Sequence, residues 1–198
     1  EEGVLSESET NLQAKGIDLV RSSSSSFTRK HCYDIINYFF KNPETYSDRE
    51  LVKLVKNLKE LFLLASVDEI SMNTGCNNYI RQVDDDVNAF KIKGSTHHGV
   101  KAACLHNFIL NQNPEFKKPY NTIKGGKIKY YYTTNPHSNE FGYQIYPKEL
   151  ATKYAPIDYN TQFDKSILSI VNRFCKVLKL TELTPDLKWS KGLNNMFN

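Results

Sequence analysis

The sequence predicts an α+β fold that is mainly α-helical. Two stretches, Leu51–Phe62 and Tyr159–Leu178, carry apolar residues at helical spacing over several turns. A third, Lys127–Tyr132, alternates charged and apolar residues before it becomes aromatic, which is typical of a strand. Of the 198 residues, 39% are hydrophobic and 24% are charged. This composition supports a modest core and argues against a disordered chain.

Charge and cysteine usage narrow the class of protein. The 26 Lys and Arg against 22 Asp and Glu give a formal net charge of +4, which permits a polyanionic partner without requiring one. The four cysteines are far apart in the sequence and form no C-x-x-C pair, so we expect buried thiols rather than a zinc site; they are Cys32, Cys76, Cys104 and Cys175. With no signal peptide and no apolar run of about 20 residues, a cytoplasmic location is expected.

The first elements follow a polar start. Residues 16–20 are apolar enough for a short strand, and a run of five serines, Ser22–Ser26, precedes a helix expected from Phe27 to about Lys41. A serine hydroxyl can accept a hydrogen bond from a free N–H group of the first turn, which favours a helix start. A flexible linker is the alternative for the serine run. Asn42 and Pro43 end this helix.

A second helix is predicted after Ser47 or Asp48, either of which can cap it. Its apolar stripe consists of Leu51, Leu54, Val55, Leu58, Leu61 and Phe62. Lysines 53, 56 and 59 fall outside the stripe, and we expect them to be solvated.

Acidic residues dominate the segment 67–88, which includes the run Asp84–Asp86. Three adjacent carboxylates suggest a metal site, but without ligand spacing a solvated loop is the preferred interpretation. A short strand, Phe90–Lys93, then ends at Gly94, and a helix is expected over His97–Leu110.

The next segment, 117–129, is strongly basic and leads into the strand Lys127–Tyr132. Tyr143–Tyr146 is the candidate pairing strand. The longest helix is predicted over Asp158–Lys179, with Asp158 as its cap.

No catalytic motif is found in the sequence. His97 and His98 are adjacent, and on a regular helix their side chains diverge too far to bind one metal ion. The basic and aromatic strand region suits nucleic acid, because lysines neutralise phosphates and tyrosines stack on bases. A chain rich in lysine and tyrosine also gives such a region by chance.

Several short segments resemble, in order, the motifs of one family. Lys15–Ser23 is similar to a K-x-G-[IL]-E-x-x-[KR]-S-S motif, and Ile157–Ser166 is similar to the M-D-Y-x-x-x-[FL]-[ED]-K-[ST] opening of a long helix. The other similar segments are Glu2–Val4, Asn77–Arg81, Phe90–Gly94, Gly126–Tyr131 followed by Asn135–Pro136, and Leu193–Phe197. Together they span nearly the whole chain and resemble the C-terminal third of family B replicative DNA polymerases of the T-even phage type.

The resemblance implies a helical polymerase thumb with a small antiparallel β element and a palm-edge strand. Residues 1–21 would be the palm-edge strand and connector, 22–184 the thumb, and 185–198 a tail with a clamp-binding peptide. It implies the thumb part of a DNA-directed DNA polymerase, which grips primer-template duplex through backbone contacts that do not read sequence. The DNA-binding residues implied are Arg21, Ser22, Ser23, Arg81, Lys93, Lys127 and Lys165. Leu193, Met196 and Phe197 would bind a sliding clamp.

The chain also departs from the family. Ser169 stands where a second lysine is frequent, and Pro156 stands where a tryptophan is common. The palm aspartates that hold two metal ions in this family would lie upstream of every segment present. We therefore expect no catalytic or metal-binding residue and no cofactor in this chain, with magnesium on an upstream palm.

The resemblance further implies that the chain is a fragment, or the smaller half of a split polymerase that acts in the host cell cytoplasm. Its partner would carry the palm and fingers, with or without an exonuclease. Two alternatives are a free-standing nucleic-acid-binding protein and an adaptor that joins two proteins without DNA. Glu2–Val4 resembles a strand cut from a hairpin, which favours the split polymerase over both.

Overall fold

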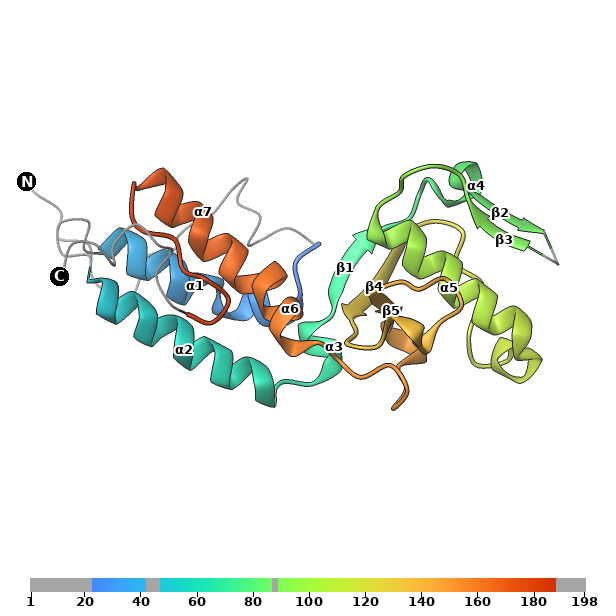
Figure 1. The fold of residues 1–198 in the computed structure, drawn as a ribbon, viewed down its shortest axis with the longest axis horizontal. Coiled ribbons are helices and arrows are strands. Elements are labelled where there is room, and N and C mark those ends of the chain that lie inside the picture. The colour runs from blue at the N-terminus through green and yellow to red at the C-terminus, as the bar shows by residue number, and fades with distance from the viewer. Residues whose placement is uncertain (1–22, 42–46, 87–88, 188–198) are drawn as a thin grey trace, which may run out of the picture.

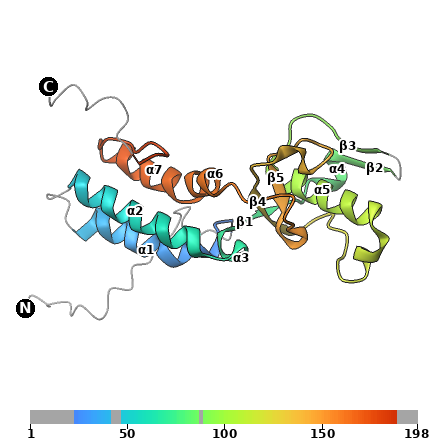
Figure 2. The same cartoon turned by 60° about the horizontal axis from the view of Figure 1, so that its bottom comes forward.

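The computed structural model describes residues 23–41, 47–86 and 89–187, and it confirms an α+β fold that is mainly helical. Its elements form two parts that follow one another along the long axis of the molecule (Figure 1, Figure 2). The helical lobe consists of α1 (Ser26–Lys41), α2 (Asp48–Leu64), α6 (Tyr159–Phe163), a π-helical turn (Asp164–Leu168) and α7 (Ser169–Val177). The segment 22–184, expected as one thumb domain, contains both parts.

The mixed lobe contains two antiparallel sheets and one long helix. The larger sheet has the strand order β1 (Met72–Gly75), β4 (Lys127–Tyr132), β5 (Ile145–Pro147), and the smaller pairs β2 (Val83–Asp86) with β3 (Ala89–Ile92). Helix α5 (His98–Gln112) packs on the larger sheet, α4 (Tyr79–Gln82) precedes β2, and α3 (Val67–Ile70) leads in from the helical lobe. Single 3₁₀ turns lie at Pro114–Lys117, Pro136–Ser138 and Lys148–Leu150.

The serine run starts α1, as predicted. The Ser25 hydroxyl accepts a hydrogen bond from the Thr28 N–H group at 3.1 Å, and the Ser25 carbonyl accepts from Arg29. Ser47 caps α2 in the same way through the Glu50 N–H group. Both helix starts therefore follow from hydroxyl side chains that satisfy first-turn donors.

The helical lobe is held by the predicted apolar stripes. Phe62 on α2 is fully buried and meets Phe27 of α1 and Phe163 of α6 edge to face, with ring centroids 5.0 and 5.3 Å apart. Leu61 was placed on the α2 stripe, and this was wrong, because its side chain is 48% exposed. At 3.6 residues per turn, it lies about 90° from the centre of the stripe. Lys59, expected to be solvated, is partly covered and donates to the Pro185 carbonyl.

The predicted strands and helices of the mixed lobe are confirmed within one or two residues. β3 and α5 match the expected strand before Gly94 and the expected helix, whose cap is the His97 side chain. β4 pairs with β5, and its middle residues are buried on both faces, with Tyr130 in one apolar cluster and Tyr131 in another. Three cysteines have side chains that the structure describes, and all three are buried thiols: Cys76, Cys104 and Cys175.

The acidic run was expected to be a solvated loop; Asp84 and Asp86 are exposed, as expected, but the backbone forms a strand and not a loop. Asp84–Asp86 lie in β2, where Asp84 stands opposite Lys91 and Asp85 opposite Phe90. The Asp85 carboxylate is also 2.6 Å from the Lys124 ammonium. Cross-strand and loop cations offset the charge that would otherwise disfavour this strand. In the described part of the chain, no group of three or more side chains is arranged to hold a metal ion.

The last helix has the predicted extent and the predicted Asp158 cap, but it is not one regular helix. Residues Asp164–Leu168 form a π-helical turn between α6 and α7. Periodicity alone did not predict this turn. Over the residues that the structure describes, no helix has the length and apolar character needed to cross a membrane.

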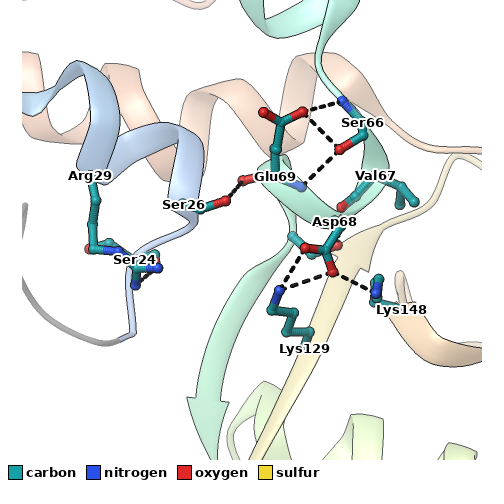
Figure 3. A network of polar contacts seen from close by, with 10 residues as sticks. Ser24, Ser26, Arg29, Ser66, Val67, Asp68, Glu69, Lys129 and Lys148 are labelled. Carbon is teal, nitrogen blue, oxygen red and sulfur yellow. Dashed lines mark hydrogen bonds and ion pairs between the residues drawn. The ribbon is translucent and has the colours of Figure 1, made fainter.

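The lobes meet at α3 (Figure 3). The Asp68 carboxylate accepts from the Lys129 ammonium of β4 at 3.0 Å and lies 2.5 Å from that of Lys148. On the other side of α3, the Ser26 hydroxyl of α1 donates to the Glu69 carbonyl. Polar contacts on both sides thus fix α3 between the helical lobe and the sheet.

Candidate nucleic-acid interface

A polar groove lies between the lobes, and we call it the interlobe groove. It consists of two adjoining hollows that share Thr74 of β1 and Tyr130 of β4. The first hollow, about 250 Å³, has a helical-lobe wall with hydroxyl and basic side chains. That wall includes Ser23, Ser24, Ser25, Lys165, Ser169 and Arg173.

The second hollow continues along β1 into the mixed lobe. Its lining includes Asn77 and Asn78 from the loop after β1, and His97 and His98 from the start of α5. The loop is held by the Asn77 side chain, which accepts from the Gly126 N–H group at 2.9 Å. The groove therefore ends at the N-terminus of a long helix, where the helix dipole favours negative charge.

His98 and Tyr130 form the floor of the groove, and Tyr132 contacts His98. The Tyr132 and Tyr130 hydroxyls lie 3.2 and 3.4 Å from His98 Nδ1. Burial lowers the pKa of His98, and nearby positive charges, including that of Lys165, lower it further. Burial also raises the pKa values of Tyr130 and Tyr132. At neutral pH the floor is therefore uncharged, and the positive charge comes from the wall above it.

Lys165 lies in the π-helical turn, with its side chain exposed. Its ammonium is 3.6 Å from the neighbouring Asp164 carboxylate, which offsets part of its charge. Ser166, the next residue, is buried, and its hydroxyl stabilises the turn by donating to the Gln162 carbonyl at 2.6 Å. π-helical turns occur frequently at functional sites, because they re-aim side chains within a helix.

Two of the predicted DNA-binding residues come together in this groove. Ser23 ends the resembling segment Lys15–Ser23 and Lys165 belongs to the segment Ile157–Ser166, yet both line the first hollow. The backbone also joins Ser23 to β1, because the Asn73 N–H group donates to the Ser23 carbonyl at 3.3 Å.

Three other predicted residues lie elsewhere. Arg81 on α4 and Lys93 after β3 are both exposed and lie close together, since the Lys93 N–H group donates to the Gln82 carbonyl at 2.7 Å. Neither lines the interlobe groove. Lys127 begins β4 opposite Gly75, and strand alternation places its side chain on the face away from Tyr130.

The remaining predicted residues are outside the described part of the chain. These are Arg21 and Ser22 of the connector and Leu193, Met196 and Phe197 of the tail. The expected strand 16–20 is outside it as well.

Sequence reasoning missed Arg173 and the contribution of the Asn77 loop to the groove. Arg173 follows Lys165 by eight residues and Ser169 by four, so the three share a helix face at i, i+4, i+8 spacing. That spacing was visible in the sequence, where Ser169 was treated only as a departure from the family. The proximity of His98 to Lys165 depends on tertiary packing and had no sequence signal.

No protein-family model matches this chain, and no match is found among curated proteins.

Proposed function

We propose that this chain is the thumb part of a DNA-directed DNA polymerase, and that it binds primer-template duplex in the interlobe groove. The observation that supports this most is the convergence of Ser23 and Lys165, from two resembling motifs far apart in the sequence, on one basic and hydroxyl-lined wall. If the basic residues reflected only a lysine-rich composition, residues from two separate resembling segments would not be expected to meet in one groove.

The groove chemistry suits phosphate backbone. Lys165 and Arg173 would supply positive charge, and the exposed Ser23 hydroxyl would donate to a phosphate oxygen. Such contacts hold the duplex without reading its sequence, and they make affinity depend steeply on salt. Arg81 and Lys93 form a second exposed basic site at the small sheet, where a longer duplex would pass.

Nucleotidyl transfer would be carried by an upstream palm with bound magnesium, and this chain would be inactive alone. Its partners would be primer-template DNA, the polymerase half with palm and fingers, and a sliding clamp that binds Leu193, Met196 and Phe197. In a helical turn, their i, i+3, i+4 spacing would place the three side chains on one side. The reaction would take place in the cytoplasm of the host cell.

The test is binding of the full chain to primed duplex over a range of salt, alone and with the upstream polymerase half. Lys165→Gln should weaken binding equally for all sequences and reduce the slope of log K against log salt by about 1. Lys56→Gln is the matched control, because Lys56 is exposed on α2 and does not line the groove.

The rivals predict different results. A free-standing nucleic-acid-binding protein would bind duplex equally with and without the polymerase half. An adaptor would show no salt-dependent duplex binding. Equal effects of Lys165→Gln and Lys56→Gln would contradict the groove as the binding site.

A further inference from the structure

The Gln162 side chain joins the two lobes through its amide group. Its Nε2 donates to the Ile70 carbonyl at the end of α3 at 2.6 Å, and its Oε1 accepts from the Tyr132 N–H group at the end of β4 at 2.8 Å. The residue has no solvent exposure. One buried amide therefore connects α6 of the helical lobe to the sheet.

The same turn is connected to the start of α1. The Ser166 hydroxyl donates to the Gln162 carbonyl at 2.6 Å, and the Ser166 carbonyl accepts from the Thr28 hydroxyl at 3.4 Å. The Thr28 hydroxyl is in turn hydrogen-bonded to the Ser25 hydroxyl at 2.8 Å. A chain of buried polar contacts thus runs from β4, past the turn that carries Lys165, to the serine wall of the groove.

A buried amide is a costly choice at this position. A buried polar group is tolerated only when its donors and acceptors are paired, and an apolar side chain of the same size would fill the same space without that requirement. The amide adds a geometric constraint, because both of its hydrogen bonds form only when α6 has one position along β4 and one rotation relative to it.

The interlobe groove depends on that relative placement. Its basic wall belongs to the helical lobe, whereas Thr74, Tyr130 and His98 belong to the mixed lobe. A phosphate can contact both walls only if the two lobes keep one relative position and orientation. Lys165 follows Gln162 by three residues, so a shift of α6 moves this cation directly.

We propose that Gln162 is a positioning residue, which keeps the two walls of the interlobe groove in register for a phosphate backbone. The inference rests on the proposed function, because it assigns Gln162 a role in duplex binding as well as in folding.

The test compares two isosteric substitutions in the full chain. Gln162→Met removes both hydrogen bonds at the lobe junction. Asn107→Leu is the matched control, because Asn107 is also buried and its amide also bridges one backbone N–H group and one carbonyl, both of Ile123, within the mixed lobe alone. Thermal unfolding and the salt dependence of duplex binding are measured for both variants.

Both variants should unfold at lower temperature. Only Gln162→Met should reduce the slope of log K against log salt, by about 1, because a displaced wall loses about one phosphate contact. Equal slopes for the two variants, with normal binding by the unchanged chain, would overturn the inference and leave the proposed function standing. Absence of salt-dependent binding by the unchanged chain would overturn both.

Gln162→Glu keeps the experiment decisive if Gln162→Met does not fold. A protonated glutamic acid can still donate to Ile70 and accept from Tyr132, whereas the carboxylate cannot donate, and burial favours the protonated form. At about pH 5, this variant should show the same slope of log K against log salt as the unchanged chain. At about pH 8, its slope should fall below that of the unchanged chain, as expected for Gln162→Met. A slope deficit that does not change with pH would contradict positioning by these hydrogen bonds.

Discussion

The helical lobe and the mixed lobe are stabilised by different means. In the helical lobe, aromatic and aliphatic side chains from α1, α2, α3, α6 and α7 fill one core, in which Phe62 meets rings from two other helices. In the mixed lobe, buried polar side chains such as His106 and Asn107 bond to loop carbonyls, and a helix approaches a strand backbone closely at Gly99. The helical lobe also buries polar side chains, but Ser25, Thr28 and Ser166 among them line the interlobe groove, whereas the mixed lobe combines its buried polar bonds with two apolar clusters around α5.

The comparison also places the interlobe groove, to which we assign the proposed function. The groove runs along the boundary between the two kinds of packing, and its basic wall comes from the helical lobe. Its uncharged hydrogen-bonding floor comes from the mixed lobe. Substitutions on either side, and at the junction, therefore test whether the lobes behave as one unit.

The largest effect is expected from Phe62→Ala in the helical lobe. Removal of a fully buried ring should cost about 3–5 kcal/mol of unfolding free energy. Because Gln162 and Asp68 couple the lobes, we expect one cooperative transition at a lower denaturant midpoint, with amide exchange accelerated in both lobes. If amides of α5 and β4 kept their protection while α1 and α2 lost theirs, the lobes would be separate folding units.

A smaller effect is expected from Gly99→Ala in the mixed lobe. A Cβ atom here would overlap the Gly75 carbonyl oxygen and lie 2.7 Å from Thr74 Cγ2, so α5 would have to move away from β1. We expect a loss of about 1–3 kcal/mol in urea unfolding, although alanine favours helix. Gly125→Ala is the control, since a Cβ there meets nothing within 4 Å. Equal stability of the two variants would contradict a close approach.

The smallest effect concerns the junction carboxylate Asp68. Hydrogen bonds from Lys148 and Lys129 lower its pKa below the usual value, so its stabilisation is present above the unfolded pKa and is lost as pH falls through the folded pKa. Because its side chain is half exposed, Asp68→Asn should cost less than about 1 kcal/mol at neutral pH and nothing in acid. Urea unfolding at several pH values, with the exposed Glu60→Gln as control, measures this difference; a pH-independent effect would contradict it.

Sequence reasoning succeeded where one physical signal dominated. The α2 stripe and the Ser47 cap were predicted from apolar spacing and a hydroxyl, because helix burial and capping are local. The acidic strand was missed, since the cations that make it tolerable, Lys91 and Lys124, come from other segments. The groove was only partly predicted: motif resemblance selected Ser23 and Lys165, but His98 is brought to the groove by tertiary packing, and the bonds of Gln162 that join the lobes link residues far apart in the sequence.

The π-helical turn has a mechanical consequence for the molecule. It divides the last helix into α6, which Gln162 anchors to the sheet, and α7, which packs with α1 and α2. The residues of the turn are themselves held in place, because Ser166, Ile167 and Leu168 are buried and Ser166 is hydrogen-bonded to both α6 and α1. The turn is therefore a fixed change of helical pitch, which sets the direction of Lys165 relative to the regular helices on either side.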